Sequence, residues 1–221
     1  MKILLSWSSG KDSAWALHLL RRDGANVAGL LTSLNESAGR VSMHGVREEI
    51  LRAQADAAGL PLRTIPLPWP CTNEIYEARL RSAVDAAVAD GFTHVAFGDL
   101  FLEDVRKYRE DRLAGTGLTP LFPVWGLPTP ALARDMMAGG LRAKLATIDP
   151  RVMPRELIGA EFDEALLLAL PPGIDPCGEN GEFHTCVTAG PMFSRALDVA
   201  GGETVEREGF VYGDLTLVRS T

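Results

Sequence analysis

The stretch that decides the fold lies near the N-terminus and reads Ile3-Leu4-Leu5-Ser6-Trp7-Ser8-Ser9-Gly10-Lys11-Asp12-Ser13. Its first apolar residues predict a buried strand, and the good helix formers of residues 14–20 predict a helix that Asp12 or Ser13 caps. A strand, a loop of small residues and a helix N-terminus favour phosphate binding, because free amides and the helix dipole face the anion. The nucleotide-binding residues predicted in this stretch are Ser6, Ser8, Ser9, Gly10, Lys11 and Ser13.

Two common phosphate-binding loops do not match this stretch. The Walker loop requires a glycine five positions before Gly10, where Leu5 stands, and a serine or threonine after the lysine, where Asp12 stands. The dinucleotide-binding fingerprint requires three spaced glycines, and this stretch contains one. The alternative to a phosphate site is an ordinary serine and glycine turn before a helix.

Composition limits the class of protein. The chain has 221 residues, 46% of them hydrophobic and 23% charged, which is typical of one or two globular domains. No stretch approaches the roughly 18 consecutive apolar residues of a membrane span, and a net charge of −7 argues against nonspecific nucleic-acid binding. The N-terminus leads directly into a strand without a signal-peptide pattern, which predicts a cytoplasmic protein with three reduced cysteines.

The first hundred residues alternate strands and helices. Strands are predicted at 3–5, 26–34, 62–67, where Pro66 indicates an early end or a sheet edge, and 94–99; helices are predicted at 46–58 and at 73–90, with Asn73 as the cap. This alternation predicts an α/β fold with a parallel sheet. Ligands of such sheets bind beyond the carboxyl ends of the strands. We therefore expect the loops at 8–13, 32–35 and 98–99 to converge, which makes Thr32, Gly98 and Asp99 candidate site residues.

The second half of the chain predicts a smaller α+β domain. A charged helix is expected at 101–113, and a packed proline-rich connection follows at 118–128. Arg106, Arg109 and Arg112 recur on it at helical spacing; they could grip a substrate carboxylate, but a solvent-facing side is favoured. We place the domain boundary near Gly126, which gives domains 1–126 and 127–221. Beyond it we predict helices at 130–138 and 161–170, a strand at 141–148 and short closing strands near the C-terminus, some of them as a hairpin.

A second cluster of polar residues lies in the later domain and reads Asp175-Pro176-Cys177-Gly178-Glu179-Asn180-Gly181-Glu182-Phe183-His184-Thr185. It gathers carboxylates, an amide, an imidazole and a hydroxyl beside an aromatic ring and a thiol. Loops with convergent polar groups frequently carry function, although a solvated acidic loop is the alternative. Cys71, Cys177, His184 and Cys186 could supply zinc ligands, but their spacing matches no paired zinc motif.

Both clusters resemble one family. Ser8, Gly10, Asp12 and Ser13 match the Ser-Gly-Gly-x-Asp-Ser loop of the PP-loop ATP pyrophosphatases, with Ser9 at a position that is usually glycine and where positive φ is expected. Residues 178–185 are similar to the Gly-Glu-x-Gly-Glu-(Phe/Tyr)-x-Thr signature of the diphthine–ammonia ligase family, and residues 43–46, 97–100 and 108–110 fit the same family. The resemblance implies a Rossmann-like adenine nucleotide α-hydrolase (HUP, PP-loop) domain followed by a smaller signature domain.

The resemblance also implies a reaction. ATP is cleaved to AMP and pyrophosphate as a carboxylate is adenylated, and ammonia then forms an amide; ATP and Mg²⁺ are the cofactors and ammonium the nitrogen source. The implied catalytic residues are Lys11, Asp12, Asp99, Glu179 and Glu182, with Asp12 and Asp99 near Mg²⁺ and His44 near the phosphates. The implied acceptor side consists of Glu179, Asn180, Gly181, Glu182, His184 and Thr185.

Several readings stay open at this point. The acceptor is either diphthine on elongation factor 2 or a small carboxylate metabolite. The chain could instead be a regulatory module that binds ATP without turnover, or a tRNA-modifying PP-loop enzyme, although it lacks a paired cysteine motif and a basic face. A homodimer is possible, and we expect no membrane or nucleic-acid partner.

Overall fold

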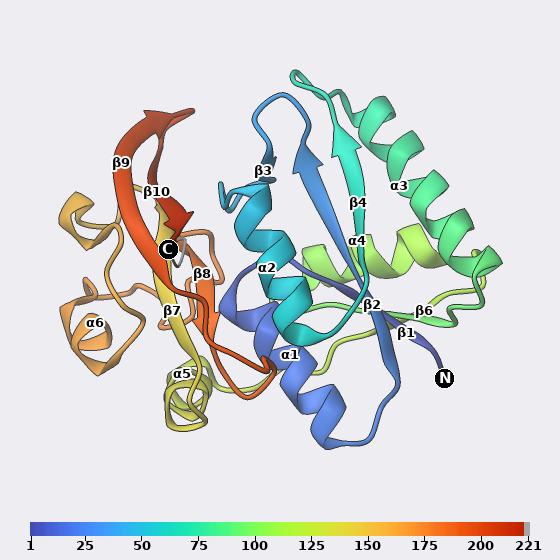
Figure 1. The fold of residues 1–221 in the computed structure, drawn as a ribbon, viewed down its shortest axis with the longest axis horizontal. Coiled ribbons are helices and arrows are strands. Elements are labelled where there is room, and N and C mark those ends of the chain that lie inside the picture. Colours follow the sequence, from blue (N-terminus) through green and yellow to red (C-terminus); the bar gives the residue numbers. More distant parts are fainter. Residues whose placement is uncertain (219–221) are drawn as a thin grey trace.

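The structure is a computed structural model that describes residues 1–218. Figure 1 shows two sheets side by side, with the first half of the chain on the right and the second half on the left. The first half contains β1 (Ile3–Ser6), α1 (Lys11–Arg22), β2 (Val27–Asn35), β3 (Arg40–Val41), α2 (Glu48–Ala58), β4 (Leu62–Leu67), α3 (Asn73–Ala89), β5 (His94–Ala96), α4 (Glu103–Leu113) and β6 (Thr119–Leu121). The second contains α5 (Thr129–Ala138), β7 (Arg142–Ile148), a short 3₁₀ turn (Arg155–Leu157), α6 (Glu164–Ala169), β8 (Phe183–Ala189), β9 (Val199–Arg207) and β10 (Phe210–Leu217).

The first sheet is mainly parallel, which confirms the predicted α/β class. Its parallel strands lie in the order β4-β2-β1-β5-β6, and the short β3 pairs antiparallel with the end of β2. β1 is central, with Leu5 opposite Leu30 on one side and Ala96 on the other. The chain builds outward from β1 in one direction through β2 and β4 and in the other through β5 and β6. A crevice is expected where this order reverses, beyond the carboxyl ends of β1 and β5.

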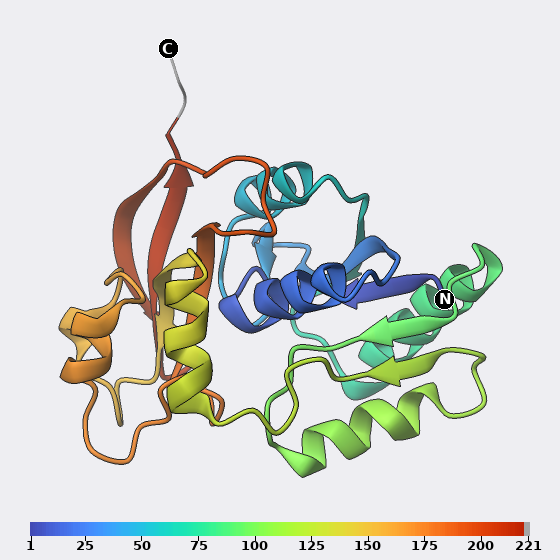
Figure 2. The ribbon, with the colours of Figure 1, turned by 90° about the horizontal axis from the view of Figure 1, so that it is seen from below.

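Alternation along β1 assigns the two faces of this sheet. Ile3 and Leu5 belong to a buried cluster with α1 and α2, whereas Leu4 belongs to a second cluster with α3 and α4. Figure 2 shows these two pairs of helices on opposite faces of the sheet. Because both faces are covered, the strands read as nearly continuous apolar runs.

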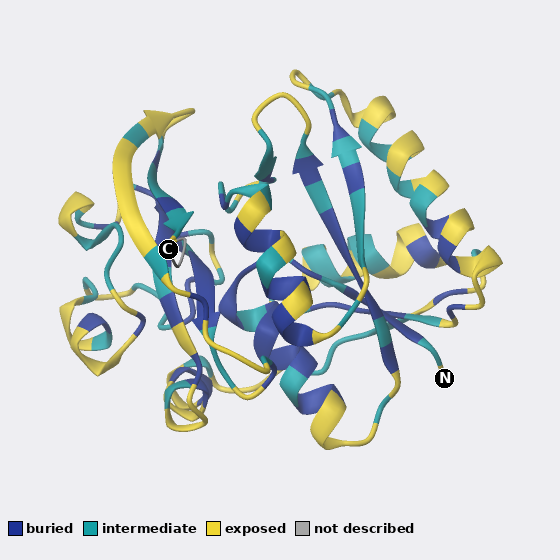
Figure 3. Ribbon diagram, in the orientation of Figure 1, coloured by how far each residue is buried: buried dark blue, intermediate teal, exposed yellow. Residues whose placement is uncertain are grey.

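The second sheet is antiparallel, in the order β8-β7-β10-β9, and packs against α1. Helix α1 lies between the two sheets, so Trp15 and Leu17 share one cluster with Leu145 and Val187 of the second sheet. Figure 3 accordingly shows α1 largely buried and the edge strand β9 exposed. One hydrophobic core therefore runs through both halves of the chain.

Several local predictions were wrong, for identifiable reasons. Gly10 is the N-cap of α1, because the helix begins at Lys11 and places both expected caps in its first turn. Thr72 rather than Asn73 caps α3, accepting from the Ile75 amide at 3.4 Å. The proline-rich connection contains the unpredicted strand β6, an edge strand where the missing N–H of Pro120 costs no ladder bond.

Two predictions were confirmed: strand β4 keeps the range 62–67 and lies at the edge of the sheet, as Pro66 indicated, and β9 and β10 form a hairpin. Other boundaries shifted: β5 ends at Ala96 rather than residue 99, and α6 is shorter than the predicted 161–170. Within residues 1–218, no helix combines the length and apolar character that crossing a membrane requires.

Candidate active site

The loop between β1 and α1 has a backbone that is fixed from three sides. Ser9 is fully buried and adopts φ of +70°, the left-handed conformation that glycine adopts freely. Its carbonyl accepts hydrogen bonds from the Val187 amide at 2.9 Å and from Gln54 Nε2 at 3.1 Å. The Thr32 hydroxyl donates to the Trp7 carbonyl at 2.6 Å. The second sheet therefore takes part in shaping this loop.

The start of α1 presents donors to a common point. The Ser13 hydroxyl donates to the Gly10 carbonyl at 3.0 Å and lies 3.2 Å from the Ser8 hydroxyl. The Lys11 amide donates to the Thr185 hydroxyl at 3.0 Å. The amides of Asp12 and Ser13 also belong to the first turn, whose N–H groups find no acceptor within the helix. This arrangement suits an anion.

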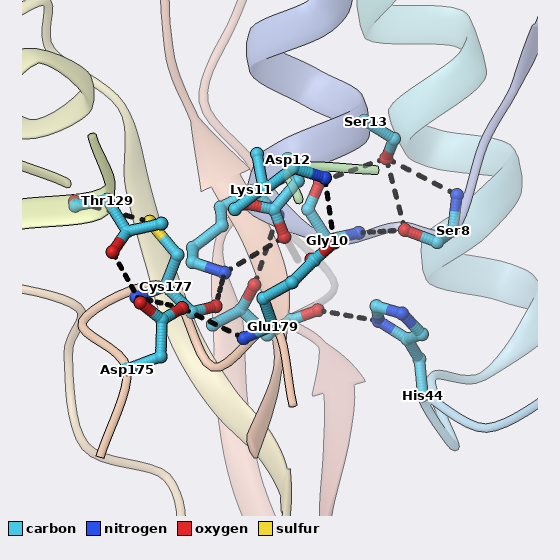
Figure 4. Close-up of polar contacts among 12 residues, drawn as sticks. Ser8, Gly10, Lys11, Asp12, Ser13, His44, Thr129, Asp175, Cys177 and Glu179 are labelled. Atoms are coloured by element: carbon cyan, nitrogen blue, oxygen red, sulfur yellow. Dashed lines mark hydrogen bonds and ion pairs between the residues drawn. The ribbon is translucent and has the colours of Figure 1, made fainter. Parts of the chain in front are cut away.

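Lys11 lies beneath the loop rather than at its open side. Its ammonium pairs with Asp12 Oδ2 at 2.9 Å and donates to the Cys177 carbonyl (Figure 4). It also lies over the rings of Phe162 and Phe183 at 5.6 and 5.3 Å. Burial lowers the pKa of Lys11, but the nearby acidic groups, Asp12 first among them, raise it by more. The pKa of Lys11 is therefore raised. Lys11 thus joins the first half of the chain to the loop of residues 175–182, which we call the signature loop.

The signature loop is organised by two of its own carboxylates. Asp175 Oδ2 accepts from the amides of Cys177 and Glu179 at 3.1 and 3.0 Å, and its other oxygen accepts from the Thr129 hydroxyl (Figure 4). Glu182 Oε1 accepts from the Asp175 amide at 3.1 Å and from Asn180 Nδ2 at 2.9 Å. The structure therefore gives Glu182 and Asn180 contacts within the loop.

A cavity of about 430 Å³ lies at the expected crevice, and the loops predicted to converge do line it. We call it the nucleotide cavity. Twelve of the predicted site residues line it: Ser6, Ser8, Lys11, Asp12, Ser13, Thr32, His44, Gly98, Asp99, Glu179, His184 and Thr185. Ser9, Gly10, Asn180, Gly181 and Glu182 are absent from its lining. These five residues instead make contacts within the surrounding loops. Their contacts with a ligand stay a prediction.

Glu179 and Asp99 are the acidic residues that line the nucleotide cavity outside α1. Glu179 Oε1 accepts from the Leu100 amide at 2.7 Å, and Asp99 lies 3.5 Å from Arg109 Nε. Burial, together with the nearby Asp12 and Asp99, raises the pKa of Glu179 to about 7. A carboxylate that titrates there can accept a proton at neutral pH.

Two imidazoles form the remaining polar wall. The rings of His44 and His184 lie 4.5 Å apart, and His44 Nδ1 is 3.2 Å from the Thr185 carbonyl. Because a carbonyl only accepts, Nδ1 carries the proton and Nε2 a lone pair. Burial and the neighbouring His184 hold the pKa of His44 well below its usual range, and burial lowers that of His184 to about 4. Both rings are therefore neutral at pH 7, so His44 offers Nε2 as an acceptor rather than a cationic phosphate contact.

Sequence reasoning missed several residues of this site. Arg109 and Arg112 line the cavity, although a solvent-facing side was predicted, and only Arg106 points to an i+4 partner, Glu110, at 2.8 Å. Tyr76 and Tyr108 also line it. Gln54, fully buried on α2, was missed because an amide on an apolar helix face carries no motif. The helical spacing of the arginines was the available signal, and it left the direction of the helix undetermined.

The buried thiols bear on the zinc alternative. Burial raises the pKa of both Cys177 and Cys186 to about 12, so neither is a thiolate at neutral pH. Among residues 1–218, no three side chains of His, Cys, Asp or Glu are grouped as a metal site. The arrangement thus gives no support to a zinc centre in the described part of the chain.

Comparison with known proteins agrees with the resemblance of the two loops. Sequence profiles of the diphthamide synthase N-terminal and C-terminal domains match residues 1–118 and 135–218. The chain belongs to the diphthamide synthase family. The diphthine–ammonia ligase of Danio rerio is 24% identical over 246 residues, covering 100% of this chain and 95% of that protein.

A second curated relative matches part of this chain, and one solved structure is weakly similar. The diphthine–ammonia ligase of Schizosaccharomyces pombe is 31% identical over 94 residues, which cover 41% of this chain and 16% of that protein. Among solved structures, a predicted subunit of tRNA methyltransferase from Methanocaldococcus jannaschii has a TM-score of 0.45 and 16% identity, covering 86% of this chain and 98% of that one. Membership of the diphthamide synthase family therefore rests on the profiles and on the ligase relatives.

Proposed function

We propose that this protein is an ATP-dependent amide ligase that forms AMP and pyrophosphate, with ammonia as nitrogen donor and diphthine on elongation factor 2 as acceptor. The observation that carries the proposal is that one cavity joins the N-terminal turn of α1 to Glu179 of the signature loop. A purely regulatory ATP site has no need for that carboxylate. The names of the relatives support the same class of reaction.

The phosphates of ATP would bind at the start of α1. The free amides of its first turn and the hydroxyl of Ser8 can donate to phosphate oxygens, while Ser13 holds the loop through the Gly10 carbonyl, and the helix dipole adds a favourable field. Lys11 contributes from below, because its charge compensates Asp12 and holds the signature loop in place. These groups would stabilise the negative charge that develops on the departing pyrophosphate.

A divalent cation fits the same corner. Asp12 Oδ1 is buried and has no hydrogen-bond partner within residues 1–218, and Asp99 lies on the cavity wall. Mg²⁺ commonly uses one or two carboxylates, with phosphate oxygens and waters as its other ligands. Asp12 and Asp99 would hold it, and the ion would neutralise phosphate charge.

The acceptor would react on the side of the signature loop. An acceptor carboxylate oxygen attacks the α-phosphorus of ATP, and the bond to pyrophosphate breaks. Ammonia then attacks the activated carbonyl, AMP leaves with the C–O bonding electrons, and one proton must leave the nitrogen. Glu179, with its pKa of about 7, is placed to accept that proton. The lone pair of His44 Nε2 provides a second acceptor for an ammonium N–H.

The first test is product analysis with ATP, Mg²⁺, ammonium and a panel of carboxylates that includes diphthine-bearing elongation factor 2. We expect AMP, pyrophosphate and amide in equal amounts and only with an acceptor. ADP and phosphate as products would refute the proposed cleavage. AMP formed only with a small carboxylate would keep the chemistry and replace the acceptor.

A matched pair of variants tests the site itself. Asp99→Asn should lower AMP formation at least about 100-fold, because it removes a charge from the cavity wall while keeping the shape. Asp90→Asn is the control, since Asp90 also pairs with an arginine, Arg63, but lies outside the cavity lining. Equal activity of the two variants would remove Asp99 from the mechanism.

A further inference from the structure

A second cavity, of about 920 Å³, lies beside the first. Its walls are the carboxyl ends of β2 and β4, the loop of residues 40–47 and the hairpin β9–β10, and we call it the hairpin cavity. Val41, Ser42, Met43, Leu67 and Tyr76 line both cavities. The two cavities therefore adjoin each other along these residues.

The loop of residues 40–47 forms a fixed partition between the cavities. Asp214 of β10 accepts from Arg47 Nε and Nη2 at 2.8 and 2.6 Å and from Arg40 Nη2 at 2.8 Å. Hydrogen bonds from these arginines lower the pKa of Asp214 to about 2, so the carboxylate stays ionised. Two guanidinium groups share one carboxylate on this wall, and Glu203 and Glu208 of the hairpin line the same cavity beside Arg207.

The hairpin cavity exposes several side chains of types that are common in protein interfaces. Trp69 and Met43 expose 59% and 66% of their surfaces, and Tyr76, Tyr212 and Arg207 line the cavity with them, beside Glu203 and Glu208. Aromatic residues, methionine and arginine are the types enriched in protein–protein interfaces, and Trp, Tyr and Arg dominate their binding energy. A polypeptide is therefore a better match for this rim than a small polar metabolite.

Size leads to the same conclusion. A nucleotide at the start of α1 would occupy much of the 430 Å³ cavity, so the body of the acceptor must lie elsewhere. The adjoining space is more than twice as large and opens between the two halves of the chain. A side chain on a polypeptide held there would meet the nucleotide from the side of Met43.

We propose that the hairpin cavity docks the polypeptide segment that carries the acceptor carboxylate, with Trp69 as its main contact. This inference rests on the proposed function for the identity of the acceptor. It adds a docking surface that lies outside the nucleotide cavity and involves none of the residues assigned to ATP.

The test measures binding without turnover. Immobilised elongation factor 2 bearing diphthine is the probe, and its Kd for the ligase is measured with a non-hydrolysable ATP analogue present. Trp69→Ala and Arg207→Ala should each weaken binding about 10-fold or more, while the Kd for the ATP analogue stays unchanged. Leu168→Ala on α6 is the control, because Leu168 is 81% exposed and lies outside both cavity linings.

The outcomes separate this inference from the proposed reaction. Absent binding of the wild-type protein, or equal Kd values for Trp69→Ala and Leu168→Ala, would overturn the docking surface even if AMP forms with a small carboxylate. Binding that depends on Trp69 would uphold the docking surface even if no AMP forms. Circular dichroism spectra matching the wild type would show that the variants fold.

Discussion

At the scale of single residues, Ser9 replaces the usual glycine of its motif at a cost in conformational free energy. Its φ of +70° is the conformation expected where relatives of this loop type carry glycine. Its hydroxyl is buried without a hydrogen-bond partner within residues 1–218. Left-handed backbone costs a non-glycine residue roughly 1–2 kcal/mol, so Ser9 is held there by Val187 and Gln54.

Replacing Ser9 separates the two costs. We expect Ser9→Gly to raise the free energy of unfolding above that of Ser9→Ala by about 0.5–1 kcal/mol, because both remove the hydroxyl but only glycine relieves the backbone. Urea melts of the two variants and the wild type measure this. A Ser9→Ala variant as stable as Ser9→Gly would show that the backbone is unstrained.

The buried imidazoles make a residue-scale prediction about pH. His184 has its pKa lowered by burial from 6.5 to about 4, so between these values the unfolded chain binds a proton that the folded chain does not. The free energy of unfolding should therefore fall as pH decreases through this window, by up to about 3 kcal/mol from this group.

His184→Gln should flatten that loss. Glu179 titrates in the opposite sense, because its raised pKa favours the folded state as pH falls from about 7 to 4.5. It is present in both proteins and cancels in the difference. Urea melts at pH 7 and pH 4.5 measure the free energy of unfolding of both proteins. If this free energy falls by the same amount in the wild type and in His184→Gln, a buried neutral His184 is excluded.

At the scale of elements, the crevice depends on how closely β5 approaches α1. A Cβ on Gly98 would lie 2.8 Å from the Ser13 amide nitrogen and 2.9 Å from the Asp12 carbonyl carbon. Both atoms belong to the backbone of the first turn of α1, which cannot move aside like a flexible side chain. Glycine two residues beyond β5 therefore allows the first turn of α1 to pack against the sheet.

Gly98→Ala should disturb this contact. We expect a loss of about 1–3 kcal/mol in unfolding free energy from overpacking, with ATP affinity falling at least about 10-fold as the turn shifts. Thermal melts and calorimetric titration with ATP measure the two effects. Gly201→Ala on β9 is the control, since nothing lies within 4 Å of its added Cβ; equal behaviour of both variants would contradict the close packing.

At the scale of the whole molecule, the two halves are joined through a common core and a buried amide. Gln54 accepts from Trp7 Nε1 at 3.0 Å and donates to the carbonyls of Ser9 and Val187 at 3.1 and 2.8 Å. Trp7 and Ser9 belong to the loop between β1 and α1, and Val187 belongs to β8. Residues on both sides of Gly126 thus share one buried cluster, whatever boundary is drawn between them.

This joint predicts cooperative unfolding. The chain should unfold in a single calorimetric transition whose van't Hoff and calorimetric enthalpies agree. Gln54→Leu should lower that one transition, losing about 2–4 kcal/mol because buried partners are left unsatisfied. Two resolved transitions in the wild type would show that residues 127–218 melt as an independent unit.

The sequence by itself determined the α/β class, the parallel sheet and the two loops whose motifs resemble the family. These features depend on local patterns: an apolar run, a helix start, and polar groups at fixed spacing. The convergence of the loops after β1, β2 and β5 followed from topology, because parallel strands end at the same edge of a sheet. The positive φ at Ser9 was also predictable from the glycine it replaces.

Only the tertiary structure decided which groups face the cavity and which hold it together. Lys11 and Glu182 read as ligand contacts in the sequence, yet Lys11 donates to the Cys177 carbonyl and Glu182 accepts from the Asp175 amide and from Asn180. Arg109 reads as a solvent-facing residue and lies at the cavity. These roles depend on contacts between segments far apart in the chain, and no local pattern encodes the direction in which a long side chain meets them.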